Sequence, residues 1–61
     1  MLFDNISRFC EKKGISIFAL EKAVGLGNGT IRLWKDSSPK VNNLKSVADY
    51  LDTTIDELMK E

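Results

Sequence analysis

A short segment of this 61-residue chain carries side chains suited to contact the bases of nucleic acid, at Asn28, Arg32 and Leu33. On a helix each residue advances by about 100°, so these positions fall with Gly29 and Asp36 within one arc of about 140°. A carboxamide matches the edge of adenine, a guanidinium pairs with guanine or a phosphate, and leucine contacts the thymine methyl group. We therefore predict that Asn28, Gly29, Arg32 and Leu33 face the bases, with Asn28 as the leading candidate.

A second set of residues is suited to bind phosphate groups. Ser16 and Ile17 precede an apolar helical pattern, and the free amides and dipole at a helix start favour an anion. Lys35 and Lys40 supply ammonium groups just after the base-facing arc. The full set of predicted phosphate contacts is Ser16, Ile17, Thr30, Lys35, Lys40 and Asn43.

The elements that must position these side chains are two short helices joined by a turn that contains glycine. The apolar positions that repeat with a helical period are Leu20, Ala23, Val24, Ile31 and Trp34. A tight corner between two such helices is a DNA-reading geometry. We therefore predict a helix-turn-helix motif over about residues 16–36, with a third helix at about 28–36 that enters the major groove.

The same segment has an alternative interpretation as a β-hairpin. The pair Asn28-Gly29 is a strong signal for a two-residue hairpin turn, and the residues at 30–34 are rich in strand formers. A hairpin needs a partner strand, however, and residues 20–26 do not alternate with a period of two. Asn28 at or next to a helix N-cap accounts for the same residues, so the helix is favoured.

The rest of the chain predicts three more helices and an all-α, compact five-helix fold in a single domain, residues 1–61. The first helix ends in Lys12-Lys13-Gly14, and Ser16 is expected to cap a second that runs to about Val24, with Gly25 beyond it. Asn42 is expected to cap the fourth helix, and Thr54 begins a capping box that opens the fifth. The inward side chains are expected to include Ile6, Cys10, Ile31, Trp34, Leu44, Val47, Leu58 and Met59, with Phe3 as a packing residue.

Composition excludes several classes of protein. Cys10 is the only cysteine and the chain has no histidine, so neither a disulfide nor a Cys/His zinc site can form within it. The chain lacks a glycine-rich phosphate loop and a nucleophile paired with a base, which argues against an enzyme. It also lacks a long apolar run and a signal-peptide pattern. We expect a cytoplasmic protein without a metal, a cofactor or a small-molecule ligand.

Charge is balanced over the whole chain but not along it. Nine basic residues face nine acidic residues, which would not by itself indicate a nucleic-acid partner. Residues 29–48 nevertheless carry four basic residues against one acidic residue, whereas residues 49–61 carry five acidic residues against one basic residue. Screening limits the reach of the acidic end to about 8 Å, so the basic segment can still bind phosphates.

A set of small, polar and apolar residues recurs in a particular order and spacing over essentially the whole chain: Gly14-Ile15-Ser16, Leu20, Gly25, Leu26, Thr30-Ile31, Trp34, Pro39, Leu44, Val47, Ala48, Leu51, Ile55 and Leu58. In this order and spacing, the residues resemble the DNA-binding domain of the lambda-type phage repressors and Cro proteins, the wider Xre-like helix-turn-helix family. One departure is Glu21, where the family commonly has alanine. Because a buried unpaired carboxylate is costly, we expect Glu21 to turn outward or to meet Arg32 or Lys35.

The resemblance implies sequence-specific binding of a double-stranded DNA operator by a transcriptional regulator, in particular a phage-type or Xre-like repressor. It also implies a homodimer on paired half-sites about one helical turn apart. The alternative is a small protein-interaction module, such as an antitoxin-like or regulator-binding domain, that uses the fourth and fifth helices.

Overall fold

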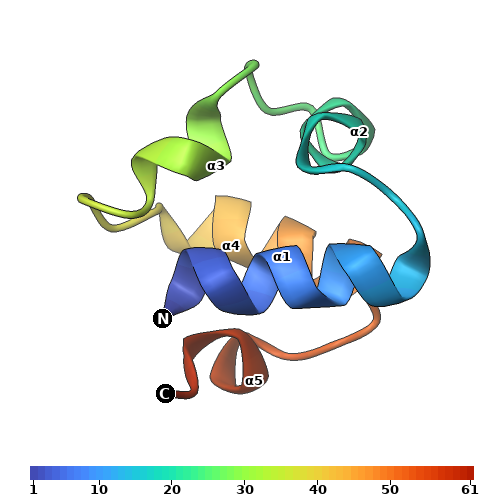
Figure 1. The fold of residues 1–61 in the computed structure, drawn as a ribbon. Helices are drawn as coiled ribbons and strands as arrows, with labels where there is room; N and C mark the ends of the chain where they lie inside the picture. The colour runs from blue at the N-terminus through green and yellow to red at the C-terminus, as the bar shows by residue number, and fades with distance from the viewer.

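The computed structural model describes all residues from 1 to 61, and it contains five helices and no strand (Figure 1). They are α1 (Leu2–Lys13), α2 (Ile17–Ala23), α3 (Thr30–Leu33), α4 (Val41–Tyr50) and α5 (Ile55–Met59). The predicted five-helix fold is confirmed, and the hairpin alternative at Asn28-Gly29 is wrong. No helix has the length and apolar character needed to cross a lipid bilayer.

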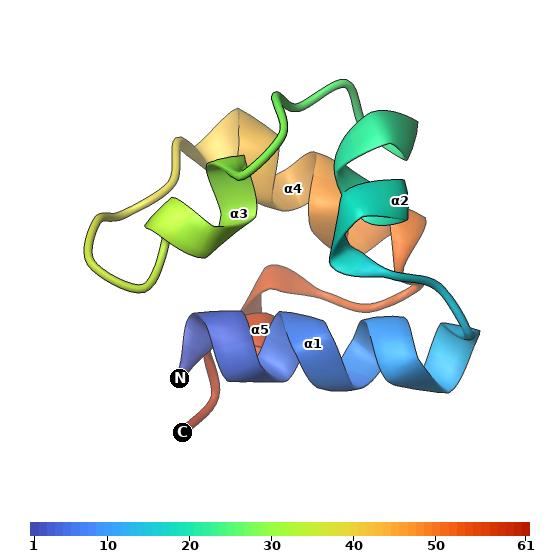
Figure 2. The ribbon, with the colours of Figure 1, turned by 45° about the horizontal axis from the view of Figure 1, so that its top comes forward.

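The helices surround a single small core. α5 packs against α1 and α4, whereas α2 packs against α1, α3 and α4. As a result, α2 and α3 lie on the opposite side of the molecule from α5 (Figures 1 and 2). Both views place the two chain termini close together, on the side of α5. This arrangement leaves the outer surface of α2 and α3 uncovered.

Three of the predicted helix boundaries are set by the capping groups that the sequence indicates. Gly14 ends α1 in the left-handed conformation at φ +78°. The Ser16 hydroxyl accepts a hydrogen bond from the Ala19 N–H at 3.0 Å, and the Thr54 hydroxyl accepts one from the Glu57 N–H at 3.1 Å. These side chains satisfy amides that have no partner within their own helix.

The predicted cap of α4 is wrong. The residue with extended backbone before the helix is Lys40, at φ −69° and ψ 145°, and its side chain makes no capping hydrogen bond. Asn42 is the second residue inside α4. A residue with helical dihedrals cannot adopt the extended conformation that brings an N-cap side chain over the first amides.

Ten buried apolar residues form the core: Ile6, Cys10, Leu20, Ile31, Trp34, Leu44, Val47, Ala48, Leu51 and Leu58. The predicted inward positions of Ile31 and Trp34 are confirmed. Two other expectations are wrong, because Ala23 is exposed and Met59 is 53% exposed. In the five-residue α5, Leu58 takes the inward position. In α2, Leu20 and Glu21 are the buried residues, which turns Ala23 toward solvent.

Cys10 lies within this core, and burial raises the pKa of its thiol. We expect the native chain to react with Ellman's reagent slowly at neutral pH and rapidly once urea unfolds it, because the thiolate is the reactive species. Fast labelling of the folded chain would contradict this placement.

The stability that the neutral thiol of Cys10 contributes is present below the ordinary thiol pKa. It is lost as the pH rises through the raised value.

Asn5 is a buried polar residue that the sequence analysis did not identify. It is 3% exposed, and its Nδ2 donates hydrogen bonds to the backbone carbonyls of Leu58 at 2.7 Å and Lys60 at 2.5 Å. Its Oδ1 accepts a hydrogen bond from the Arg8 guanidinium. The Asn5 amide therefore fastens the last turn of the chain to α1.

Replacing Asn5 with alanine should lower the free energy of unfolding by about 1–2 kcal/mol, because the carbonyls of Leu58 and Lys60 lose their shared donor, and the bond to Leu58 is buried. Urea denaturation followed by Trp34 fluorescence would measure the change. The matched control is Asn42→Ala on the exposed surface of α4. The control should stay within about 0.5 kcal/mol of the wild type. Equal effects of the two substitutions would show that the Asn5 bonds contribute nothing specific.

Candidate nucleic-acid interface

The buried Glu21 carboxylate of α2 binds backbone amides of the turn between α2 and α3 and of the start of α3. Glu21 is 2% exposed, and its Oε1 accepts a hydrogen bond from the Gly29 N–H at 3.1 Å. Its Oε2 accepts one from the Ile31 N–H at 2.9 Å. The first amides of a helix have no partner within the helix, and their dipole favours a negative charge. The carboxylate of α2 therefore caps the N-terminus of α3.

This contact corrects the expectation that Glu21 turns outward or meets Arg32 or Lys35. The free-energy cost of burying the Glu21 carboxylate is offset by hydrogen bonds from two backbone amides and not by a cation. The sequence did contain a signal for the contact between Glu21 and the turn. Glu21 follows Leu20 on the inward side of its helix, and a glycine-rich turn with free amides follows, whose last glycine, Gly29, is eight residues later.

Gly29 has a structural role in addition to the base-facing position predicted for it. It lies outside α3, as its N-cap residue, and its φ of +88° is in the left-handed region. An added Cβ would meet no atom within 4 Å, so the requirement for glycine comes from the backbone conformation and not from crowding. This conformation turns the Gly29 amide toward Glu21.

The third helix is also shorter than predicted, since α3 covers Thr30–Leu33 and not about 28–36. After Leu33 the chain continues as tighter turns, in which the amides of Trp34, Lys35 and Asp36 bond to carbonyls three residues earlier, at 3.0, 3.2 and 3.1 Å. Burial of Trp34 anchors this end of the helix in the core. The segment is therefore fixed at both ends, by Glu21 and by Trp34.

The predicted base-facing residues all lie on this segment, although not all on the helix. Arg32 and Leu33 belong to α3 and are exposed, Leu33 to 66%. Asn28 is exposed and Gly29 is half-buried, and both lie in the turn before α3. The angular arrangement expected for a helix over 28–36 therefore holds for Arg32 and Leu33 but not for Asn28 and Gly29.

The predicted phosphate contacts come from three elements. Ser16 and Ile17 are at the start of α2, which packs against α3. The Ser16 oxygen already accepts the Ala19 amide, and Ile17 packs against the core. Thr30 is the half-buried first residue of α3, and Lys35 is exposed just beyond it.

The remaining two positions, Lys40 and Asn43, lie at the start of α4. Lys40 is exposed and Asn43 is half-buried. They follow α3 through the loop that contains Pro39. The sequence thus brings these positions near the end of the segment from Asn28 to Lys35, whereas Ser16 and Ile17 come close to that segment only through the packing of α2 on α3.

The cations of this region are not neutralised by carboxylates. The three ion pairs of the structure join Lys13 to Asp52, Lys45 to Asp49, and Lys60 to Glu57, at 3.4 to 3.5 Å. Arg32, Lys35 and Lys40 have no carboxylate oxygen within the 4.0 Å of an ion pair. Their charges are therefore available to an anionic partner, in spite of the neutral total.

Comparison of this chain with known protein families gives one match. The family model described as the Cro/C1-type HTH DNA-binding domain matches residues 5–60. No curated protein and no solved structure matches the chain. The matched range includes every predicted site residue, from Ser16 to Asn43.

Proposed function

Because this chain belongs to the family of Cro/C1-type helix-turn-helix DNA-binding domains, we propose that it binds a double-stranded operator sequence-specifically and acts as a phage-type or Xre-like repressor. The observation that carries the proposal is the segment from Asn28 to Lys35. It is fixed at both ends and exposes an amide, a guanidinium and a leucine. Its cations have no carboxylate partner. In this proposal α3 enters the major groove.

In this proposal only a few groups contact the bases. Arg32 donates two hydrogen bonds to the O6 and N7 acceptors of guanine, and the Asn28 amide matches the N6 and N7 atoms of adenine. Leu33 offers an apolar contact to a thymine methyl group, and the Gly29 backbone comes close to the DNA without a side chain. A helix of four residues is only about 6 Å long, so it spans few base pairs.

Phosphate contacts supply much of the remaining affinity in this proposal. We assign them to Ser16, Ile17, Thr30, Lys35, Lys40 and Asn43, whose positions flank α3 on the side of α2 and on the side of α4. Neutralising a phosphate with a cation releases counterions, so the contacts of Lys35 and Lys40 each make binding more sensitive to salt.

We further propose that two copies bind together. The Cα atoms of one chain span 23 × 22 × 17 Å, whereas paired half-sites in this class of motif lie roughly 34–36 Å apart. A single chain cannot present α3 to both half-sites. Occupation of the operator by the pair would block transcription from an overlapping promoter.

Selection of bound duplexes from a random pool, followed by a salt titration of the selected sequence, tests the proposal. We expect an enriched motif with two related half-sites and an affinity that falls steeply between about 50 and 200 mM salt. Failure to bind any duplex at low salt would overturn the proposal. It would favour the protein-interaction alternative, in which α4 and the acidic α5 form the contact surface.

A further inference from the structure

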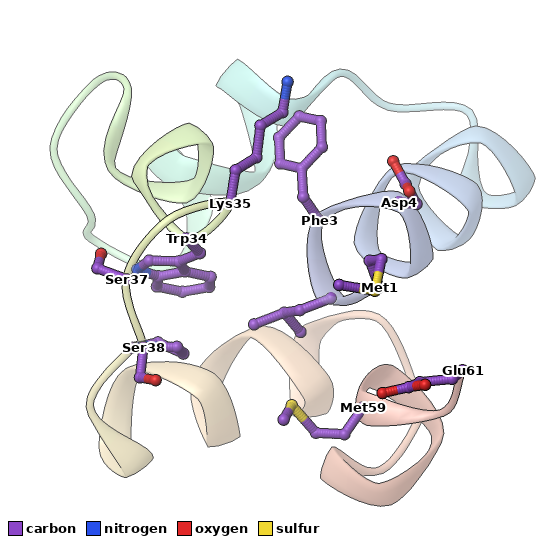
Figure 3. Close-up of a pocket in the computed structure, with 11 residues that line it drawn as sticks. Met1, Phe3, Asp4, Trp34, Lys35, Ser37, Ser38, Met59 and Glu61 are labelled. Atoms are coloured by element: carbon purple, nitrogen blue, oxygen red, sulfur yellow. The ribbon is translucent and has the colours of Figure 1, made fainter.

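One cation of the proposed interface is held by an aromatic ring from a different helix. The Lys35 Nζ lies 4.6 Å from the centre of the Phe3 ring, and Figure 3 shows the two side chains next to each other on the wall of a surface groove. The other three lysine–aromatic pairs of the chain are longer, at 5.5 to 5.7 Å. The face of an aromatic ring attracts an ammonium group at such distances.

Both partners of this contact are attached to fixed parts of the fold. Phe3 lies in the first turn of α1 and packs against the core. The Lys35 backbone is held by the bond from its amide to the Arg32 carbonyl at 3.2 Å, and the preceding Trp34 is buried. The Lys35 side chain therefore extends from the end of the segment Asn28 to Lys35 to α1, where its ammonium group is restricted to the region of the Phe3 ring.

The contact restrains the ammonium group without neutralising it. Lys35 forms no ion pair, so its charge is intact. An ammonium has three N–H donors, and a ring face occupies only the side that it covers. The donors on the other side remain open to a phosphate oxygen.

We propose that Phe3 is a positioning residue for DNA binding, which holds the Lys35 ammonium in place for a backbone phosphate before DNA arrives. A free lysine side chain loses considerable rotamer freedom when it is immobilised at an interface. Because the Phe3 ring already restrains the Lys35 side chain in the free protein, less rotamer freedom is lost when DNA binds. The inference rests on the proposed function, in which Lys35 contacts phosphate.

Phe3→Leu tests the inference, because it keeps the apolar packing and every charge but removes the ring. With a mixed-sequence duplex of about 20 base pairs, we expect the affinity to fall about 2- to 5-fold, with the slope of the salt dependence unchanged. Lys35→Ala should reduce that slope by about one phosphate contact. Phe3→Leu should cause no further loss in the Lys35→Ala background. Phe3→Tyr, which retains the ring, should bind like the wild type.

The matched control is Phe9→Leu, which removes the ring under Lys12 on the same helix. It should leave DNA affinity unchanged, and far-ultraviolet circular dichroism should show that all variants are folded under the binding conditions. A loss of affinity in Phe3→Leu that persists without Lys35, or equal losses in both phenylalanine variants, would mean a purely structural role and would overturn the inference. So would an unchanged or higher affinity in Phe3→Leu, since the ring would then not assist Lys35.

A measurement on the unmodified chain makes the test independent of variant stability. The ε-methylene protons of Lys35 should show an upfield ring-current shift by NMR, in the free protein and in the DNA complex. Loss of the shift on binding would show that the ammonium leaves the ring, and would overturn the inference alone. Absence of binding by the wild type would instead overturn the proposed function, and this inference with it.

Discussion

Replacement of Glu21 with alanine should lower the free energy of unfolding by about 3–5 kcal/mol, the largest effect that we expect from any single substitution in this chain. The change leaves the Gly29 and Ile31 amides without their acceptor in the interior. It also opens a void beneath the turn. A domain of this size has only about 3–5 kcal/mol of stability, so the free energy of unfolding should fall close to zero, and folded and unfolded molecules should be present in comparable amounts at 25 °C.

Glu21→Gln separates the hydrogen bonds from the shape of the side chain. Glutamine keeps one oxygen acceptor but directs an NH2 group toward the second amide, so we expect a loss of about 1–3 kcal/mol. Urea denaturation followed by Trp34 fluorescence measures both variants. Glu11→Gln, on the exposed surface of α1, is the matched control and should change stability by less than about 0.5 kcal/mol. Wild-type stability in Glu21→Gln would show that the buried carboxylate does not cap α3.

Replacement of Arg32 with alanine should weaken binding to the selected operator by about 1–3 kcal/mol, or roughly 5- to 150-fold, since the proposed function assigns to this guanidinium two hydrogen bonds with a guanine. The loss should be concentrated at one base position, where discrimination among the four base pairs is relaxed. Arg32 is exposed and forms no ion pair, so stability should change little. Titration of the operator and its single-base variants measures both the affinity and the specificity.

Lys60→Ala provides the control for the loss of one positive charge. Lys60 pairs with Glu57 on α5, on the side of the molecule opposite α3. Its replacement should leave operator affinity and base preference nearly unchanged. If Arg32→Ala instead causes a small loss that is equal for all sequences, then Arg32 binds a phosphate and the reading of guanine assigned to it is wrong.

Local pattern was sufficient to predict the helices and most of the core. The apolar period placed Ile31 and Trp34 inward, and Ser16 and Thr54 cap the helices that they were expected to cap. These features depend on interactions within a few residues, such as the capping of free amides and the burial of one helical side. The prediction failed for Asn42 at α4, where the choice of the first helical residue depended on the backbone after Pro39.

Contacts between distant residues were not predictable in this way. Asn5 bonds to carbonyls more than fifty residues away, Glu21 caps a helix that begins nine residues later, and the Lys35 ammonium rests on the ring of Phe3. Residue type and helical period determine which side chains face inward, but not which group each of them meets. The sequence was enough to predict a helix-turn-helix fold and a set of candidate DNA contacts, of which Ser16, Asn28, Arg32, Leu33, Lys35 and Lys40 are exposed. Only the packing of α1, α2 and α3 decided how α3 is held, because a buried polar side chain is satisfied by whatever donors or acceptors the fold brings to it.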